Sequence, residues 1–465
     1  MKEYREIYVI LVVSLLLILA PIFLNISIFY GLFSAVVFAL VILSWKGTSL
    51  KYLLKTILAG LNECKTVFIV VLLMGATISI WLASGIVPSM IYYGLKHINN
   101  INFLLASFLI TSVVSIFMGT PVGTISTIGI ALLGVGKGLS IPLNMILGAI
   151  VSGAFLADKA SPISALTNLA LNVIDMDYKK YLKTMLKTIV PTFIITSAFF
   201  YIMGEPYSNA LDFSKINSYQ EIIKGTYYIS PYFLLIPLGT IILSGVGVQV
   251  ITTMLIGIGI GSFICYFYQG MSIKSIAYSI FMGYGGPEIV NELSHIFKGG
   301  GIIHMVEVVL VIGTAVSLSS IFEKTNIIAP IIDKLFKGTK SKGILTIKTG
   351  ILSSLLTIIT CDQSVGIILP GRLLQPIYDR MGISKYILGR TISDTGTIIA
   401  PLFPFNVNSL LITTFTGIAA KEYAPYAILC YVFPIITILL GFISNKKKGD
   451  IKNEKLCDKI STSNR

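Results

Sequence analysis

Long apolar stretches alternate with short polar segments along the chain of 465 residues. Many of these stretches reach the roughly 17–25 residues with which a helix crosses the hydrocarbon core of a bilayer. They cover residues 7–24, 27–45, 66–83, 101–118, 185–203, 229–246, 249–268, 303–322, 343–360 and 424–441. The pattern predicts an all-α polytopic membrane protein with about 10–14 transmembrane segments.

Two other apolar regions, 119–173 and 361–418, are interrupted by Gly, Pro, Ser, Thr, Asn and Asp. Irregular backbone at membrane depth is tolerated only where protein buries it or where it lines an aqueous cavity. In secondary transporters, interrupted helices of this kind form the substrate site near the bilayer midplane. We therefore expect broken or re-entrant helices in both regions and a substrate site built from them.

The composition excludes the other broad protein classes. Charged residues make up 12% of the chain, about half of the roughly 25% expected in a soluble domain, and the mean hydropathy is +0.86. Five cysteines and three histidines are dispersed, so neither a disulfide framework nor a transition-metal site is predicted. The net charge of +14 is not gathered in a basic domain, so no nucleic-acid partner is expected.

Lysine and arginine are distributed unequally between alternate loops. With the N-terminus inside, the segments assigned to the cytoplasm hold 21 of these residues and the segments assigned outside hold six. The cytoplasmic segments are 46–65, 175–188, 323–348 and 445–465, and the external ones are 84–100, 204–228, 268–301 and 415–423. Because basic residues concentrate in cytoplasmic loops, we predict a multi-pass protein of the cell membrane with both termini cytoplasmic. The basic tail, 445–465, is expected to lie against anionic lipid.

The two halves of the chain resemble each other in several short segments. The matched pairs are 46–60 with 269–283, Gly119-Thr120 with Thr360-Cys361, Asp158 with Asp394, Pro162 with Pro401 and Asn168 with Asn406. Chance similarity between apolar helices is the alternative explanation, but the matches keep the same order in both halves. An odd number of spans in each half would make the copies inverted in the membrane. We therefore predict two inverted structural repeats, 1–225 and 226–444.

Three acidic residues, Asp158, Asp362 and Asp394, lie inside the broken apolar regions. A charged side chain at the bilayer centre costs on the order of 3 kcal/mol or more, so such residues are by default functional candidates. A carboxylate that holds either a proton or a cation is the simplest device for exchanging the two. Alternatively, each Asp caps a half-helix or pairs with a neighbouring base. For Asp158, which precedes Lys159, the two interpretations have equal weight.

Small oxygen-bearing side chains are concentrated near these acids, and hard cations prefer oxygen ligands. The predicted cation and proton site therefore combines the three Asp residues with Asn168, Asn406, Thr120, Thr124, Ser161 and Thr397. Arg372 and Arg390 are candidates to bind a substrate carboxylate through bidentate hydrogen bonds. Pairing with a local acid, or extension toward the interface, is the more usual role of such residues.

Several motifs follow one another in a fixed order through these regions. They are WLASGIVPSMIYYGL (81–95), GTPVGTISTIGI (119–130), GAIVSGAFLADKASPISALTNLA (148–170), EKT (323–325), CDQ (361–363), LPGR (369–372), RTISDTGTIIAP (390–401) and PFN (404–406). Through them the chain, from about residue 60 to 440, resembles the NhaC family of sodium/proton antiporters. The resemblance implies cation-coupled exchange, sodium out for protons in, and a fold of inverted repeats with broken or re-entrant helices.

The chain departs from the family pattern at two places. Where the family usually has Ser-Asp-Thr-Thr-Asn, residues 164–168 read SALTN, and Cys361 stands where Gly is usual. Relatives in the family include exchangers of malate and lactate and carriers of amino acids. The absent acid at Ala165 therefore motivates an alternative, a sodium- or proton-coupled transporter or exchanger of a small carboxylate or amino acid.

These features together predict a secondary active antiporter that exchanges Na+ for H+ by alternating access at a midplane site. Na+ and H+ are then substrates, no cofactor is expected, and the partners are the lipid bilayer and a small ion or organic solute. A channel is less favoured because its pore usually repeats by oligomer symmetry. No nucleophile–base pair in the sequence suggests an enzyme. The sequence leaves a homodimer open.

Overall fold

The computed structural model describes residues 2–24, 26–96, 102–208, 213–286, 298–325, 335–336, 338–339 and 341–443. Within this part of the chain the structure is helical, apart from an isolated bridge between Tyr284 and Gly299. Eight of the described helices are long and apolar enough to cross a membrane, or up to eleven segments if each bent pair is one span. The predicted all-α polytopic fold is confirmed.

The helices of the first half follow closely the apolar stretches of the sequence. They are α1 (Lys2–Leu24), α2 (Ile28–Trp45), α3 (Leu50–Glu63), α4 (Lys65–Ala83), α5 (Ile86–Lys96), α6 (Phe103–Met118), α7 (Pro121–Thr124), the π-helix η1 (Ile125–Gly129), α8 (Ile130–Gly138), α9 (Leu143–Ala154), α10 (Ala157–Ala160), α11 (Ala165–Val173), α12 (Tyr178–Ser208) and α13 (Phe213–Thr226).

The second half begins with a bent pair and contains its own series of short segments. Its elements are η2 (Pro231–Leu234), α14 (Leu235–Gly245), α15 (Val250–Phe267), α16 (Ile273–Met282), α17 (Ile302–Lys324), α19 (Lys342–Thr360), α20 (Gln363–Arg380), α21 (Lys385–Ile392), the π-helix η3 (Ser393–Thr397), η4 (Ala400–Leu402), α22 (Val407–Thr416), α23 (Ala420–Tyr423), η5 (Ala424–Tyr426) and α24 (Ile428–Ile443).

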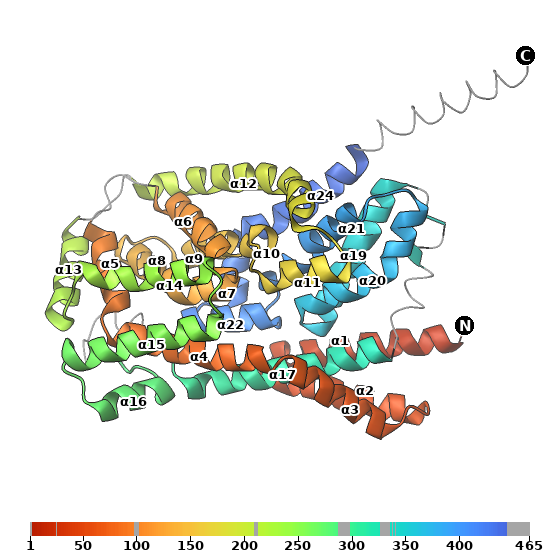
Figure 1. The fold of residues 1–465 in the computed structure, drawn as a ribbon, viewed down its shortest axis with the longest axis horizontal. Helices are drawn as coiled ribbons and strands as arrows, with labels where there is room; N and C mark the ends of the chain where they lie inside the picture. The colour runs from red at the N-terminus through yellow and green to blue at the C-terminus, as the bar shows by residue number, and fades with distance from the viewer. Residues whose placement is uncertain are drawn as a thin grey trace, which may run out of the picture.

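The helices are arranged in two layers (Figure 1). In one layer α17 packs against α2, α3 and α4, and α4 packs against α15 and α16. In the other, α6 packs against α9 and α12, while α19 packs against α20 and α24. The short elements α7, η1 and α22 contact one another, and η1 also contacts α4 while α22 contacts α17. Both irregular regions therefore reach the boundary between the layers.

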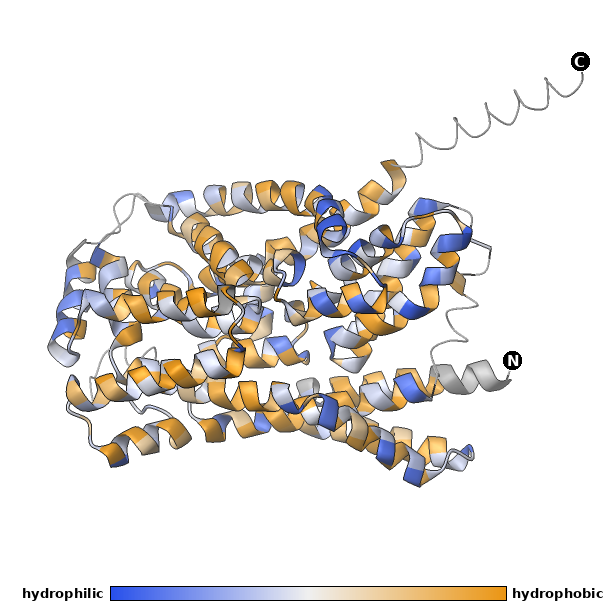
Figure 2. Ribbon diagram, in the orientation of Figure 1, coloured by the Kyte–Doolittle hydropathy of each residue, from blue (hydrophilic) through white to orange (hydrophobic). Residues whose placement is uncertain are grey.

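Apolar residues cover most of the helix lengths in both layers, and many hydrophilic residues lie toward the ends of the long helices (Figure 2). Large apolar side chains such as Phe33, Ile194 and Phe263 are exposed on the outer surface. Exposed Phe and Ile at such density would be unfavourable in water but match the hydrocarbon of a bilayer. The surface therefore agrees with a protein embedded in lipid.

Both irregular regions begin with the same backbone turn. Helix α6 ends at Gly119, which has a left-handed conformation with φ +68°, and the extended residue Thr120 caps α7. Helix α19 ends at Cys361, with φ +58°, and the extended residue Asp362 caps α20. The left-handed conformation costs roughly 1 kcal/mol for a residue other than glycine. Contacts with the surrounding structure must therefore stabilise the turn at Cys361.

Further backbone features recur at the same spacing of 242 residues. Left-handed conformations occur at Ser140 and Gly382, and again at Asp175 and Gly417. This spacing differs from the sequence matches, which placed Gly119 opposite Thr360 and Asp158 opposite Asp394. Those two pairings use offsets of 241 and 236 residues, one and six positions shorter than the spacing of the backbone turns. Whether the two halves are inverted in the membrane stays a prediction.

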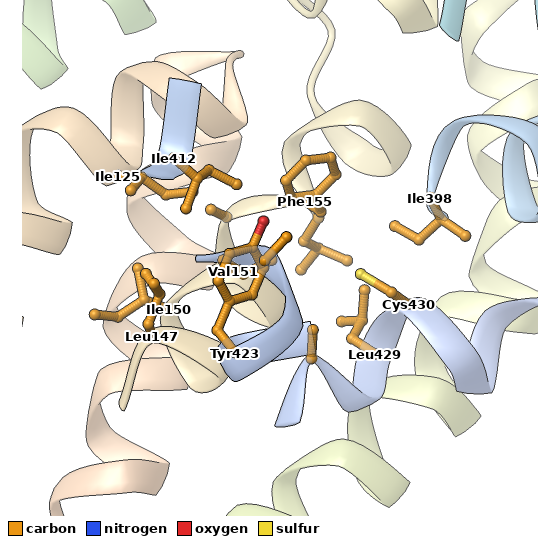
Figure 3. Packing of buried hydrophobic residues seen from close by; sticks show 14 of the residues in the cluster. Ile125, Leu147, Ile150, Val151, Phe155, Ile398, Ile412, Tyr423, Leu429 and Cys430 are labelled. Atoms are coloured by element: carbon orange, nitrogen blue, oxygen red, sulfur yellow. The ribbon is translucent and has the colours of Figure 1, made fainter. Parts of the chain in front are cut away.

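The core of the second layer surrounds Tyr423 (Figure 3). Leu147 and Val151 of α9 and Phe155, its C-cap, lie near this ring, and Leu429 of α24 packs nearby. The Tyr423 hydroxyl donates a 2.8 Å hydrogen bond to the carbonyl oxygen of Pro401. A buried tyrosine usually needs such a partner, and here the bond joins η4 to α23, which packs against α9.

Close packing of α9 on α6 predicts that Gly153→Ala will destabilise the protein. A Cβ at Gly153 would lie within 3.0 Å of atoms of Phe108, Thr111 and Ser112. Overpacking of this kind costs about 1–3 kcal/mol, so thermal unfolding in detergent should begin at a lower temperature. Gly259→Ala is the matched control, because no atom lies within 4 Å of its added Cβ. Equal unfolding temperatures for the two variants would contradict the packing.

Candidate ion-binding site

Lys159 is completely buried in the second layer. It lies on the single turn α10, and its Nζ donates hydrogen bonds to the Ser393 carbonyl oxygen, to Ser393 Oγ at 3.0 Å and to Thr397 Oγ1 at 3.0 Å. The ammonium also lies 5.5 Å from the centre of the Phe433 ring, a cation–π distance. Lysine is rarely buried completely in a protein interior unless it is paired. Lys159 is therefore a candidate functional residue.

Asp394 lies on the π-helix η3 and faces Lys159. Its Oδ1 is 3.9 Å from Lys159 Nζ, and its Oδ2 accepts a hydrogen bond from Thr437 Oγ1. Oδ1 accepts no hydrogen bond from any residue that the structure describes, although the side chain is fully buried. Buried carboxylate oxygens are normally satisfied. A single π-turn often accompanies a functional site, and here it presents the carboxylate inward.

Asp158 and Arg390 complete a group of four buried ionisable residues, called here the lysine cluster. Asp158 Oδ1 accepts a 2.9 Å hydrogen bond from Ser164 Oγ, and its backbone oxygen accepts one from Thr167 Oγ1 at 3.1 Å. Arg390 is 4% exposed and lies one turn before Asp394, within electrostatic range of it. Two carboxylates and two bases therefore share the cluster, which consists of Asp158, Lys159, Arg390 and Asp394.

Asp362 lies at the second helix interruption rather than in the lysine cluster. Its Oδ1 accepts a 2.9 Å hydrogen bond from the Ser364 amide, which makes it the N-cap of α20. The side chain is partly exposed, and its ionisable neighbours are Glu323 of α17 and Cys64 beside α4. Both neighbours belong to the other layer. Asp362 thus lies where the two layers meet.

Side-chain amides connect the second interruption with the lysine cluster. Asn406 Nδ2 donates to the Cys361 carbonyl oxygen at 3.1 Å, and Gln363 Nε2 donates to the Thr397 carbonyl oxygen at 2.5 Å. Asn408 Nδ2 donates to Gln363 Oε1 at 2.9 Å. Because Thr397 also bonds Lys159 through its hydroxyl, one network joins the turn at Asp362 to the buried cluster.

A small cavity of about 30 Å³ lies at the first interruption, with room for one or two water molecules. The residues that line it are Thr77, Thr120, Ser126, Thr127, Thr240 and Thr253 together with Trp81, Met118, Gly123, Val250, Met254 and Gly257. Four of their hydroxyls donate to carbonyl oxygens of their own helices, those of Thr77, Ser126, Thr127 and Thr240. Because these hydroxyls are engaged with the backbone, the surface that the cavity presents is mainly apolar.

The remaining predicted residues are placed less centrally. Thr124 Oγ1 donates to the Thr120 carbonyl oxygen at 2.9 Å, and Ser161 is buried at the end of α10. Asn168 is exposed, and its Nδ2 donates to the carbonyl oxygens of Pro162 and Ser164. Asn168 is therefore not brought to the lysine cluster. Ala165 is exposed one turn earlier, so an acid there would also lie outside the cluster.

The two arginine candidates have different surroundings. Arg372 Nη1 lies 3.4 Å from Glu323 Oε1, and its side chain is 62% exposed. It therefore pairs with a local acid. Arg390 is buried in the lysine cluster, where Asp394 is the acid within range.

Several residues that shape the site were not among the sequence candidates. From the sequence, Lys159 is notable only as the neighbour of Asp158. Gln363, Thr437 and Glu323 are not among the predicted ion-binding residues. Lys159, Gln363 and Glu323 all lie within the family motifs, and that position could have identified them as candidate site residues. Thr437 lies in an ordinary apolar helix, and only the folded structure brings it to Asp394.

Comparison with known proteins agrees with this architecture. A model of the Na+/H+ antiporter family matches residues 153–444. The malate-2H+/Na+-lactate antiporter of Bacillus subtilis is 30% identical over 98% of this chain and 100% of its own length. The Na+/H+ antiporter NhaC of the same organism is 30% identical over 89% of this chain and 91% of its own. The arginine/ornithine antiporter ArcD of Halobacterium salinarum is 27% identical over 83% and 80%. The chain belongs to the Na+/H+ antiporter family.

Proposed function

We propose that this protein is a secondary antiporter that exchanges Na+ for H+ across the membrane by alternating access. The observation that carries the proposal is Asp394, a buried carboxylate on an interrupted helix with one oxygen that accepts no hydrogen bond from the described residues. Such a group can bind a proton or a cation but not both. Family membership and the NhaC relatives support the same exchange.

Asp362 is the second proposed ion ligand. It lies at the boundary of the layers with Glu323 nearby, so a cation that enters between the layers meets two carboxylates there. The network through Gln363 and Thr397 then connects this entry point with Asp394. Asp158, Asn406, Thr120 and Thr124 support the two interruptions, and Ser161 ends α10.

The second candidate function is coupled transport of a small carboxylate or amino acid. It is favoured by the full-length similarity to a malate/lactate antiporter. Against it, the cavity at the first interruption has room for only one or two water molecules. The two arginines considered for a substrate carboxylate are already beside Glu323 and Asp394. Exchange of Na+ for H+ therefore remains the preferred function.

Transport by reconstituted protein separates the two functions. Proteoliposomes with an imposed pH gradient receive Na+, K+ or choline, each alone or with lactate, malate or arginine. We expect Na+ alone to discharge the gradient and the organic solutes to add nothing. A gradient that is stable to Na+ and falls only when a solute is added would overturn the proposed function and support the second candidate.

We further propose that both termini are cytoplasmic and that 1–225 and 226–444 form inverted repeats. The excess of basic residues in alternate loops supports the orientation, and the backbone turns at Gly119 and Cys361 support the repeat. Labelling of Cys457 with an impermeant maleimide tests the orientation. Reaction in right-side-out vesicles, before permeabilisation, would contradict it.

A further inference from the structure

Four lysines share one side of the first part of α12. The helix spans Tyr178–Ser208, and Lys179, Lys180, Lys183 and Lys187 lie in its first three turns. At 3.6 residues per turn, the four positions fall inside a sector of roughly 100°. All four side chains are exposed. These four residues are called here the basic face of α12.

The basic face points away from the interior of the protein. The residues on the opposite side of the helix, Tyr181, Met185 and Thr188, are completely buried. Among them, Thr188 lies beside Asp394 and Tyr181 lies beside Ser393. Helix α12 itself runs along the outer edge of the second layer (Figure 1). The four lysines are therefore directed toward the surroundings of the protein.

The same side of α12 becomes apolar beyond the lysines. Val190 and Ile194 continue the line of the basic face and are 50% and 62% exposed, as expected of side chains in contact with hydrocarbon. The helix has 31 residues and is therefore about 46 Å long, whereas the hydrocarbon core is about 30 Å thick. The lysines occupy about 12 Å at one end of it, which places them at the level of the lipid headgroups.

No acid offsets the charge of the basic face. None of its lysines forms an ion pair with a residue that the structure describes. The two acids just before the helix are engaged elsewhere, since Asp175 pairs with Lys385 and Asp177 Oδ1 accepts a 3.0 Å hydrogen bond from the Lys180 amide. Like charges four residues apart on a helix destabilise it. An anion bound between these lysines would therefore be stabilising.

We propose that the basic face of α12 is a binding site for an anionic phospholipid. The phosphate of the lipid lies among the lysine ammonium groups, and an acyl chain lies along Val190 and Ile194. Lysines next to a membrane attract anionic lipid by about fivefold in affinity for each residue. Lysines that served only to fix the orientation of the chain would not need to share one side of a helix. Lipid binding here does not depend on the proposed exchange of Na+ for H+.

Photochemical crosslinking tests the site with purified full-length protein in detergent. The probe is phosphatidylglycerol with a diazirine in its acyl chain, and crosslinks to α12 are mapped by mass spectrometry after chymotryptic digestion. Unlabelled phosphatidylglycerol, phosphatidylcholine and glycerol phosphate are the competitors. They distinguish an anionic lipid from a zwitterionic one and from a soluble phosphate.

Two paired variants and a control show whether the lysines bind the lipid. The pair Lys183→Gln/Lys187→Gln removes two charges from the basic face, and Lys183→Arg/Lys187→Arg keeps them. Lys224→Gln/Lys274→Gln is the matched control, because it removes two exposed lysines from the separate helices α13 and α16. Every variant is compared with wild type at the same concentrations of probe.

We expect phosphatidylglycerol to compete at least tenfold better than phosphatidylcholine, and glycerol phosphate not to compete. The Gln pair should bind the probe at α12 about 20-fold more weakly, because each lysine contributes about fivefold. The Arg pair and the control pair should bind it as wild type does. Should the Gln pair fail to fold, the single variants Lys183→Gln and Lys187→Gln decide the question, each with an expected loss of about fivefold.

Three results would overturn the site. Equal competition by phosphatidylcholine and phosphatidylglycerol would show that α12 does not select anionic lipid. Competition by glycerol phosphate as strong as that by phosphatidylglycerol would replace the lipid by a soluble phosphate. Wild-type crosslinking of α12 in the Gln variants would exclude the lysines as ligands. Since Na+-dependent discharge of a pH gradient is measured separately, each of these results leaves the proposed function standing.

Discussion

Replacement of Asp394 by Asn is expected to reduce Na+-dependent discharge of a pH gradient in everted vesicles by about 100-fold or more. The substitution removes the negative charge that pairs with Lys159 and that we propose as the ion ligand. Removing one partner of a buried ion pair costs roughly 3–5 kcal/mol, and each 1.4 kcal/mol is a factor of ten. We also expect lower thermal stability, because the Lys159 ammonium remains buried without a counter-charge.

A double variant separates loss of transport from loss of folding. Combining Asp394→Asn with Lys159→Gln removes both charges of the pair, so most of the lost stability should return. Transport should stay absent, because no anionic ligand remains at η3. Asp175→Asn is the control for the substitution itself, since Asp175 is exposed and lies outside the cluster. Full exchange by the Asp394→Asn variant would exclude Asp394 as an ion carrier.

Replacement of Asp362 by Asn should also weaken Na+-dependent exchange, but with little effect on stability. Asn is as good an N-cap as Asp, so the hydrogen bond from the Ser364 amide can be kept. The lost charge removes a charge-assisted ligand worth about 1.5–3 kcal/mol, and we expect an approximately 10–100-fold weaker response to Na+. The response is measured as the Na+ concentration that half-discharges the gradient.

Asp362→Ala is the companion variant for this position. It removes the charge and the cap together, and loss of a cap costs about 1 kcal/mol. The Ala variant should therefore unfold at a lower temperature than the Asn variant while transporting equally poorly. If the Asn variant responds to Na+ as wild type does, Asp362 is a structural cap and not an ion ligand.

The spans could be predicted closely because hydropathy is a local property. The stretch 66–83 corresponds to α4, which covers Lys65–Ala83, and 249–268 corresponds to α15, which covers Val250–Phe267. The two irregular regions could be predicted for a similar reason, since clusters of Gly, Pro, Ser, Thr and Asp favour breaks in a helix. The candidate acids followed from their position in those regions, and Asp394 and Asp362 both lie at helix interruptions.

The register of the repeat could not be predicted from residue identities. Gly119 and Cys361 share a left-handed conformation although their side chains differ. Equivalent positions are defined there by the backbone, which the sequence does not display. Apolar helices accept many residues at each site, so sequence matches alone leave the offset between the two halves open by several positions, and the pairing of Asp158 with Asp394 stays a prediction.

By itself, the sequence determined that this is a helical membrane protein, where its helices break, and which few acids lie inside them. Each of these follows from the local cost of placing polar groups in hydrocarbon. Only the tertiary structure decided which groups meet. Lys159 and Ser393 are 234 positions apart in the chain, and Thr437 reaches Asp394 from another helix. A buried charge needs partners, but any base or hydroxyl at the right distance can serve. Tertiary packing therefore decides that Lys159 is the partner of Asp394, because it brings together segments that are far apart in the sequence.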